Sequence, residues 1–332
     1  MPASDIRIIQ PSSDIHIFNL PHYCPVNGTV DETAQKIRDM TIRGAGRIAR
    51  AGSEALGDFA RSYKGNDIDR FREDLKKAAD TILSSRPTAV SLLNGVNYTI
   101  KGADREESVD AARELIIRNS ELFCESSLKA AETVARIGAK RIADGDVIMT
   151  HCNSSMAIGV IKEAFRQGKD IRVYATESRP WRQGLITVRQ LAEAGIDTTL
   201  IIDSAVRTVM EWTDKVFVGA DTVTSQGYLV NKIGTSQLAL SADEARVPFY
   251  CCTETYKFSP LTIDGDIVPI EERDVSEVVS PGDIPGSVKV FNPVFDTTPA
   301  KYIDAYITEE GVLSPGSVYG IMIEKFGYNR KE

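Results

Sequence analysis

The feature that most constrains the fold is an alternation of short apolar runs and helical segments in the second half of the chain. The apolar runs cover residues 147–150, 171–175, 198–202, 215–219 and 248–252, and helical periodicity between them covers residues 156–167, 181–194, 206–211 and 234–245. Strands that alternate with helical crossovers are typical of βαβ units on a parallel sheet. We therefore predict an α/β fold with a Rossmann-like, doubly wound parallel sheet domain over residues 146–332, closed by a helix at 317–326.

The first part of the chain differs, because helical periodicity dominates it up to residue 145. The predicted helices cover residues 32–40, 46–63, 69–84, 89–100 and 108–143, and residues 1–145 are predicted as a mainly helical N-terminal domain. Residues 1–28 are less regular, although 15–18 are compatible with a strand. In the second domain we expect residues 264–283 to form a surface excursion and residues 292–299 to be irregular or extended.

The composition narrows the class of protein. The chain has 332 residues, of which 42% are hydrophobic and 26% charged, and a formal net charge of −8. These values are typical of a globular protein and argue against a nucleic-acid partner. No stretch approaches the roughly 18 consecutive apolar residues of a membrane span, so we expect a cytoplasmic protein that does not bind a membrane.

Cysteine and histidine usage gives no sign of a disulfide framework or a metal centre. The five cysteines are irregularly spaced and there are only three histidines, so we expect no metal and no other cofactor. The sequence has no Gly-x-Gly-x-x-Gly fingerprint after the first predicted strand and no Walker lysine motif. This disfavours NAD and ATP chemistry despite the predicted fold.

The segment 146–155 carries the strongest chemical signal. An apolar strand leads directly to Cys152 and then to Ser154 and Ser155, which are predicted as N-cap residues of the next helix. We expect the positive end of the helix dipole to lower the pKa of the Cys152 thiol, and the free amides there to suit a phosphate. The alternative is a buried, chemically inert cysteine.

Polar residues follow the other predicted strands as well, and the carboxyl ends of parallel strands form the ligand-binding edge of a doubly wound sheet. Asp221 follows the fourth strand, where partial burial would raise the pKa of its carboxyl group into the range of a general acid. The alternative for Asp221 is a helix or turn cap. The other polar residues expected in this crevice are Asn153, Glu177, Ser178, Arg179, Asp203, Ser204, Thr253, Glu254 and Lys257.

Several cations lie at predicted helix ends. The segment 42–46, Ile-Arg-Gly-Ala-Gly, combines a cation, two glycines and a helix start, which suits a phosphate cradle or, alternatively, a simple turn. Arg86 lies between two helices, where it could cap carbonyl groups or bind a phosphate through two hydrogen bonds. Asn231 and Lys232 precede the helix that begins near residue 234, so Lys232 either needs an anion partner there or points into solvent.

Six segments, taken in order, resemble a known family: Ile42-Arg-Gly-Ala-Gly46, Ser85-Arg-Pro-Thr88, Thr150-His-Cys-Asn-Ser154, Thr176-Glu-Ser-Arg-Pro180, Val218-Gly-Ala-Asp221 and Asn231-Lys-Ile-Gly-Thr235. Together they resemble the aldose-phosphate isomerases related to the regulatory subunits of the eukaryotic translation initiation exchange factor. Within that group they are most similar to the archaeal ribose-1,5-bisphosphate isomerases. The resemblance extends from about residue 30 to the C-terminus, so residues 1–28 lie outside it.

The resemblance implies an aldose–ketose isomerase that converts ribose 1,5-bisphosphate to ribulose 1,5-bisphosphate, in an AMP and nucleoside salvage route that feeds a type III Rubisco. It also implies a homo-oligomer, expected to be a hexamer, that AMP activates. Cys152 and Asp221 match the catalytic pair of the family, the Cys152 thiolate acting as base and Asp221 as acid. The implied substrate contacts are Arg43, Gly44, Ala45, Gly46, Arg86, Ser154, Ser155, Met156, Asn231, Lys232 and Lys257, with Glu177 and Arg179 as further candidates.

Two alternatives stay open. Methylthioribose-1-phosphate isomerases share the cysteine, the aspartate and the reaction type, but this chain offers more cations near the predicted crevice, which suits two phosphates. A regulatory subunit that binds a nucleotide or sugar phosphate without turnover shares the fold. The presence of both Cys152 and Asp221 favours an enzyme over a regulatory subunit.

Overall fold

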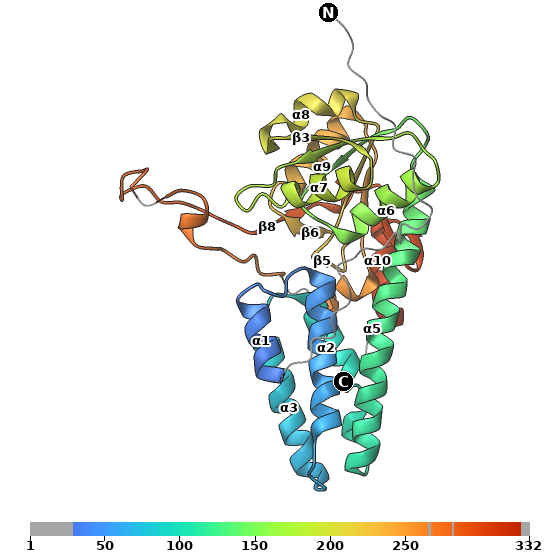
Figure 1. The fold of residues 1–332 in the computed structure, drawn as a ribbon, viewed down its shortest axis with the longest axis vertical. Coiled ribbons are helices and arrows are strands. Elements are labelled where there is room, and N and C mark those ends of the chain that lie inside the picture. Colours follow the sequence, from blue (N-terminus) through green and yellow to red (C-terminus); the bar gives the residue numbers. More distant parts are fainter. Residues whose placement is uncertain (1–28, 265–266, 281, 327–332) are drawn as a thin grey trace, which may run out of the picture.

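A computed structural model describes residues 29–264, 267–280 and 282–326 of the chain. The segment 15–18 lies outside the described residues. Within the described part, no helix is long and apolar enough to cross a membrane. The overall shape is an elongated helical bundle joined to a sheet layer that helices cover on both faces (Figure 1).

The bundle consists of α1 (Val30–Arg38), α2 (Ala45–Ser62), α3 (Ile68–Ser84), α4 (Val90–Ile100) and α5 (Val109–Ala139). Three of these helices begin at the capping residues Thr29, Asp67 and Ser108, whose side chains accept hydrogen bonds from amides of the first turn. The apolar faces meet in one core that includes Leu56, Phe71 and Ile116. The predicted helices are confirmed, although α5 ends at Ala139 rather than at residue 143.

The main sheet has seven strands in the order β10-β9-β7-β4-β1-β2-β3. The strands are β1 (Val147–Thr150), β2 (Arg172–Thr176), β3 (Asp197–Ile201), β4 (Lys215–Val218), β7 (Phe249–Cys252), β9 (Ala305–Thr308) and β10 (Gly311–Leu313). All neighbouring pairs are parallel except β9 and the edge strand β10. The chain starts in the middle of the sheet and winds outward in both directions, which confirms the predicted doubly wound α/β fold.

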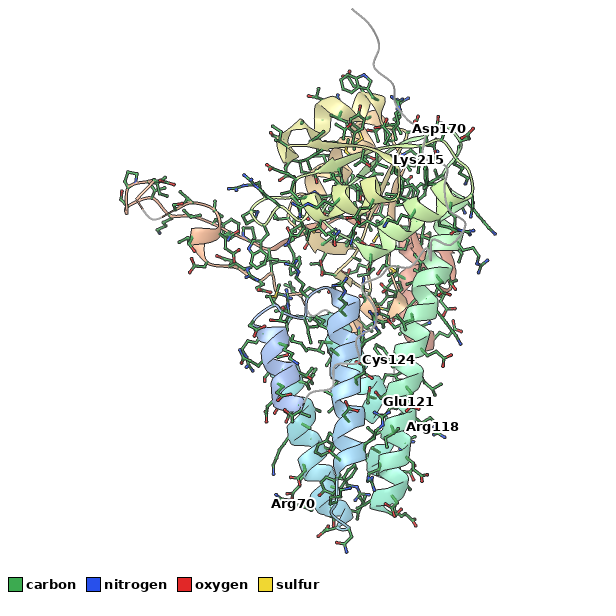
Figure 2. All side chains as sticks on the ribbon, in the orientation of Figure 1. Arg70, Arg118, Glu121, Cys124, Asp170 and Lys215 are labelled. Atoms are coloured by element: carbon green, nitrogen blue, oxygen red, sulfur yellow. The ribbon has the colours of Figure 1, made fainter. Side chains whose placement is uncertain are left out.

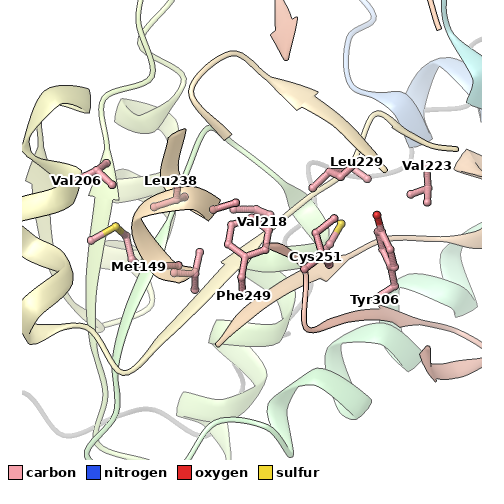
Figure 3. Close-up of a cluster of buried hydrophobic side chains, with 14 of the residues drawn as sticks. Met149, Val206, Val218, Val223, Leu229, Leu238, Phe249, Cys251 and Tyr306 are labelled. Carbon is pink, nitrogen blue, oxygen red and sulfur yellow. The ribbon is translucent and has the colours of Figure 1, made fainter. Parts of the chain in front are cut away.

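Helices cover both faces of this sheet, so strand side chains alternate between two cores. Ile148 and Phe217 face the C-terminal part of α5 together with α6 (Ser155–Arg166) and α7 (Gly184–Glu193). Met149 and Val218 face α8 (Val206–Val209), α9 (Thr235–Ala245) and α10 (Val318–Phe326) (Figure 3). Burial on both faces is why these strands are continuous apolar runs.

The carboxyl ends of the strands face the helical bundle. Asp170 and Lys215, which lie at the amino ends of β2 and β4, are at the end of the molecule away from the bundle, whereas Arg70 marks its opposite tip (Figure 2). The contact between the two parts is close: a Cβ on Gly138 of α5 would lie 2.4 Å from Val160 of α6. The division into separate domains, 1–145 and 146–332, stays a prediction.

A second, smaller sheet was not predicted. It is antiparallel, with the order β5-β6-β8, and consists of β5 (Thr222–Val223), β6 (Leu229–Lys232) and β8 (Phe295–Thr298). Only the extended character of residues 292–299 was expected. The segment between β7 and β8 contains the predicted surface excursion, which projects from the body of the protein (Figure 1).

Two helix predictions need correction. The helix predicted at 181–194 begins at Gly184, because residues 180–183 form turns. The helix predicted at 206–211 is α only to Val209 and continues as a 3-10 turn to Trp212.

Candidate active site

Cys152 lies at the carboxyl edge of the sheet, two residues beyond β1, in a left-handed backbone conformation with φ of 64°. Ser154 is the N-cap of α6, and its hydroxyl accepts a hydrogen bond from the amide of Ala157 at 3.3 Å. This turn packs against the end of β4, where a Cβ on Gly219 would lie 2.2 Å from the Ser154 hydroxyl. Only glycine therefore fits at position 219, and the close approach brings the loops after β1 and β4 together.

The predicted lowering of the Cys152 pKa is wrong for the protein as the structure describes it. Burial raises the pKa of the Cys152 thiol to about 11, although the ammonium of Lys232 and an amide hydrogen bond act in the opposite direction. The helix dipole is too weak to reverse the cost of desolvating a thiolate, because its effect falls off within the first turn. The free protein therefore holds Cys152 as a thiol at neutral pH.

Asp221 lies between β4 and β5, and its backbone amide donates to the carbonyl of Val230 at 3.1 Å. Burial raises the pKa of the Asp221 carboxyl, as expected. Three cations oppose that rise: Lys232, Lys257 and Arg86. They come from β6, from the loop after β7 and from the helical bundle, so distant parts of the chain converge on one carboxyl group.

Lys257 is almost fully buried. It lies in a short 3-10 turn, Thr255–Lys257, and its ammonium forms an ion pair of 2.8 Å with Glu254. The hydroxyl of Tyr256 donates to the other oxygen of Glu254 at 2.7 Å. The side chain of Asn94, on α4, donates to the carbonyl of Tyr256 at 2.8 Å. The bundle thus holds the turn that carries Lys257.

The predicted phosphate cradle lies against this turn. Gly44 is the N-cap of α2 with φ of 91°, a conformation that favours glycine. A Cβ on Gly46 would lie 2.9 Å from the Tyr256 hydroxyl, so the second glycine allows close packing. Arg43 is exposed. Sequence analysis missed Arg47, whose pKa is lowered by burial and by the charges of Arg50 and Arg43, and which extends the positive region along α2.

Arg86 is half-buried at the same end of the bundle, just beyond α3. Its Nη2 lies 3.3 Å from the carboxylate of Glu271, and its Nη1 lies 3.2 Å from the sulfur of Met40. Because Glu271 belongs to the projecting segment, the base of that segment forms part of the wall around Asp221. Arg86 therefore faces the site rather than capping α3.

Lys232 and Asn231 lie at the end of β6. Asn231 is buried and donates to the hydroxyl of Thr235 at 3.0 Å, and the Lys232 ammonium lies 5.3 Å from the centre of the Phe295 ring. An anion does lie at the start of the next helix, because the carboxylate of Asp296, on β8, accepts the amides of Gly234 and Ser236. The charge of Lys232 acts on Cys152 and Asp221, whose pKa values it lowers.

The remaining predicted site residues lie nearer the rim or in the core. Glu177 pairs with Arg182 at 3.7 Å, and the guanidinium of Arg179 donates to the carbonyl of Val278 at 3.1 Å. The side chain of Met156 is buried in the apolar core, so only its backbone amide is suited to bind a ligand. Ser155 is exposed in the first turn of α6, and Ala45 occupies the same position in α2.

Two further side chains shape the loops around the site: Asp203, which was expected in this crevice, and His151, to which sequence analysis gave no role. The carboxylate of Asp203 accepts the amides of Ser178 at 2.8 Å and Arg179 at 2.7 Å, which ties the loop after β3 to the loop after β2. The imidazole of His151 is buried between two loops. Its place beside Cys152 in the sequence was the one available signal. Among the described residues, no group of three or more His, Cys, Asp or Glu side chains is placed to hold a metal ion.

The arrangement is thus a half-buried thiol and a half-buried carboxyl, with several cations near the carboxyl, at the topological switch point of a doubly wound sheet. Residues 41–315 match the family described as "Initiation factor 2 subunit family". The chain belongs to this family. Relatives named ribose 1,5-bisphosphate isomerase are 52% identical in Archaeoglobus fulgidus, covering 90% of this chain and 93% of the relative, and 49% identical in Methanocaldococcus jannaschii, covering 91% and 97%.

Solved structures agree with this family assignment. The crystal structure of 5-methylthioribose 1-phosphate isomerase from Pyrococcus horikoshii is 31% identical with a TM-score of 0.75, covering 89% of this chain and 88% of that one. The similarities confirm the fold and the predicted relationship to the archaeal isomerases. They also confirm that this member of the family is an isomerase.

Proposed function

We propose that this chain isomerises ribose 1,5-bisphosphate to ribulose 1,5-bisphosphate. The observation that carries the proposal is the convergence of Arg86, Lys232 and Lys257 on Asp221. Lys232 also acts on the Cys152 thiol. Three cations around one carboxyl and one thiol suit a substrate that carries two phosphates and reacts by proton transfer.

The chemistry needs one base and one acid. The C1 oxygen of the substrate carries a phosphate, so the sugar has no free aldehyde, and the ring must open during the reaction. A base removes the proton from C2, the electron pair forms the C1–C2 double bond, and the C1–O bond of the ring breaks as its oxygen takes a proton from the acid. The enol phosphate then receives a proton at C1 and loses the C2 hydroxyl proton, which yields the ketose.

We assign the base to Cys152 and the acid to Asp221. Together the pair must carry one proton, and the negative charge of Asp221 raises the pKa of the Cys152 thiol, so the two groups are close enough to interact. In the free protein the dominant one-proton form is a thiol beside a carboxylate. Lys232 stabilises both the Cys152 thiolate and the Asp221 carboxylate, so the choice of Cys152 as base and Asp221 as acid is supported by the family resemblance.

The two phosphates are assigned to two groups of anion-binding atoms. One is the start of α6, with Ser154, the amides of Ser155 and Met156, and nearby Asn231. The other is the region of Arg43, Gly44, Ala45 and Gly46 at the start of α2, next to Lys257 and Arg86. Glu177 and Arg179 shape the rim. Positioning by these charges supplies much of the rate, because both phosphates hold the sugar over the reacting pair.

The decisive experiment follows ribulose 1,5-bisphosphate production by the purified chain from ribose 1,5-bisphosphate, with methylthioribose 1-phosphate as the competing substrate. We expect turnover of the bisphosphate with a kcat/KM at least 100-fold higher. A preference for methylthioribose 1-phosphate would make the chain a methylthioribose-1-phosphate isomerase, as the 31% identical structure is named. Binding of either sugar without turnover would make it a regulatory subunit.

Assembly, regulation and pathway are proposed on the resemblance. We propose a homo-hexamer, whose mass by light scattering would be six times the 36.4 kDa of the chain, and activation by AMP, visible as a higher initial rate when AMP is added. We propose that the product feeds a type III Rubisco in AMP and nucleoside salvage. Depletion of this chain from a cell extract would then abolish formation of ribulose 1,5-bisphosphate from AMP.

A further inference from the structure

The backbone of Cys152 is held by two side-chain hydroxyl groups. Its amide donates to the hydroxyl of Ser178 at 2.7 Å, and its carbonyl accepts from the hydroxyl of Thr187, also at 2.7 Å. Both partners are fully buried. Since a non-glycine residue with positive φ is strained, the conformation of Cys152 persists only because its surroundings enforce it.

The hydroxyl of Ser178 belongs to a hydrogen-bonded chain that ends at His151. The Oγ of Ser178 lies 3.1 Å from the Oγ1 of Thr176, which lies 2.6 Å from the Nδ1 of His151. The Nε2 of His151 lies 2.8 Å from the carbonyl oxygen of Ile233. All three side chains are at most 2% exposed.

The direction of every proton in this chain follows from its ends. A carbonyl oxygen only accepts, so Nε2 of His151 carries the proton, and Nδ1 of a neutral ring must accept from Thr176. Thr176 has then used its only proton and accepts from Ser178. Ser178 in turn has its lone pairs free for the Cys152 amide. Burial also lowers the pKa of His151, which agrees with a neutral ring.

His151 also connects the two loops that carry the reacting thiol and its cation. Ile233 directly follows Lys232 in the chain, and a Cβ on Gly234 would lie 3.0 Å from the Cε1 of His151. The ring therefore fills the space between the end of β1 and the turn between β6 and α9. A change at His151 or Thr176 would affect the Cys152 backbone and the Lys232 loop together.

We propose that His151, Thr176 and Ser178 are positioning residues for the isomerisation: they fix the Cys152 thiol and set its place relative to Lys232. The role rests on the proposed function for its kinetic meaning, but the placement of the thiol can be tested without turnover. None of the three residues touches the reacting atoms in this scheme. Each acts through the backbone of Cys152 or through the turn that carries Lys232.

The sharpest test compares Thr176→Val with Thr176→Ser. Valine keeps the shape of threonine and removes the hydroxyl, whereas serine keeps the hydroxyl. We expect Thr176→Val to lower kcat by about 10- to 100-fold with KM changed less than about threefold, because small displacements of a reacting group are costly in rate. We expect Thr176→Ser to retain at least about a third of the wild-type kcat. Equal kcat values for the two variants would overturn the proposal, whatever their melting temperatures.

Alkylation of Cys152 by iodoacetamide, followed by peptide mass spectrometry, gives a second readout that needs no substrate. Thr176→Val should shift the pH dependence of the Cys152 alkylation rate, and Thr176→Ser should not. Ser178→Gly removes the hydroxyl where φ is 59°, a backbone that glycine tolerates, and should give the same shift even if the valine variant does not fold. Unchanged alkylation profiles in both Thr176→Val and Ser178→Gly would refute the positioning role. If the wild type shows no turnover but the two variants still shift the alkylation profile, only the proposed function is refuted.

Discussion

The guanidinium of Arg86 and the carboxylate of Glu271 form an ion pair of 3.3 Å that joins the helical bundle to the projecting segment 185 residues later in the chain. Both groups also act on Asp221: Arg86 lowers the pKa of its carboxyl, and Glu271 raises it. Glu271 therefore neutralises part of the charge that Arg86 would offer to a phosphate. An incoming phosphate must compete with Glu271 for this arginine.

The first prediction concerns this pair. Arg86→Ala should weaken binding of ribose 1,5-bisphosphate by about 10- to 150-fold, because a lost charge-assisted contact costs roughly 1.5–3 kcal/mol. Ribose 5-phosphate should lose less, and Arg43→Ala should behave in the same way. Glu271→Gln should tighten binding, because Arg86 then has no competing anion. Calorimetric titration of both ligands measures these effects.

Arg70→Ala is the matched control, since Arg70 lies on α3 at the far tip of the bundle (Figure 2). It should leave both affinities unchanged. Equal losses for the bisphosphate and the monophosphate in Arg86→Ala would show that Arg86 does not serve a second phosphate.

The second prediction concerns the buried ion pair of Glu254 and Lys257. Burial alone would raise the pKa of Glu254, but the Lys257 ammonium and hydrogen bonds outweigh burial, so the pKa of Glu254 is lowered. Burial alone would lower the pKa of Lys257, but the charge of Glu254 and the hydrogen bond to it outweigh burial, so the pKa of Lys257 is raised. Glu254→Gln should lower the free energy of unfolding by about 3–5 kcal/mol, because it leaves a buried ammonium unpaired. Urea denaturation measures this loss.

The double variant Glu254→Gln with Lys257→Met should recover much of that stability, since neither charge is then left alone. The exposed pair Glu125 and Lys129 is the control, and Glu125→Gln should leave the denaturation midpoint unchanged. The pH dependence of the stability follows from the two pKa shifts. The stabilisation by the ion pair should be lost when pH falls through the lowered pKa of Glu254 or rises through the raised pKa of Lys257. A Glu254→Gln variant as stable as the wild type would contradict the prediction.

The fold was predictable wherever the signal is local. Strands buried on both faces, such as β1 and β4, are continuous apolar runs, and helices such as α3 begin at a strong capping residue. The small sheet was not predictable, because β6 and β8 are short, polar at their ends and pair across more than 60 residues. Its pairing brings Asp296 to the start of α9, a contact that no local pattern encodes.

The placement of the candidate site residues was predictable from the sequence, whereas their electrostatics were predictable only in part. Cys152 and Asp221 could be singled out because each follows a strand at the ligand-binding edge. The direction of the Cys152 pKa shift could not be predicted from the sequence, because it depends on how deeply the surrounding loops bury the thiol. The partners of Arg86 and Lys257 come from distant segments, so their geometry required the structure.

The third prediction concerns the titration and role of Cys152. The Cys152 alkylation rate should rise with pH toward a midpoint near 11, since burial sets the pKa of the thiol at about 11. Lys232→Gln should move the midpoint upward, because it removes the cation that stabilises the thiolate. Cys124, Cys251 and Cys252 are buried and should react more slowly.

Cys152→Ser should preserve the fold and substrate affinity but lower turnover by orders of magnitude, because a serine hydroxyl is a far weaker acid than a thiol and is not readily made into a base. Turnover and circular dichroism measured on one preparation separate activity from folding. Near-normal turnover in the serine variant would remove Cys152 from the chemistry.

The last prediction concerns Asp221 and the shared proton. Asp221→Asn should bind ribose 1,5-bisphosphate yet barely convert it, because asparagine keeps the shape and the hydrogen-bonding capacity of the side chain but cannot exchange a proton. If Asp221 were only a turn cap, asparagine would cap about as well, and both stability and turnover would survive. Turnover above about a tenth of the wild-type value would show that Asp221 is not the general acid, since general acid–base catalysis contributes about 10²–10⁴-fold to the rate.

The pH profile of the wild type gives an independent check of the same pair. One proton shared by Cys152 and Asp221 predicts a bell-shaped dependence of kcat/KM. Activity should be lost as pH falls through the raised pKa of Asp221, where both groups are protonated, and again as pH rises toward 11, where both are deprotonated. In Asp221→Asn the limb set by Asp221 should disappear, and the residual activity should instead rise with pH toward the pKa of Cys152, because only the thiolate base is then required. An acidic limb that persists unchanged in this variant would assign that titration to another residue and leave Asp221 a structural role.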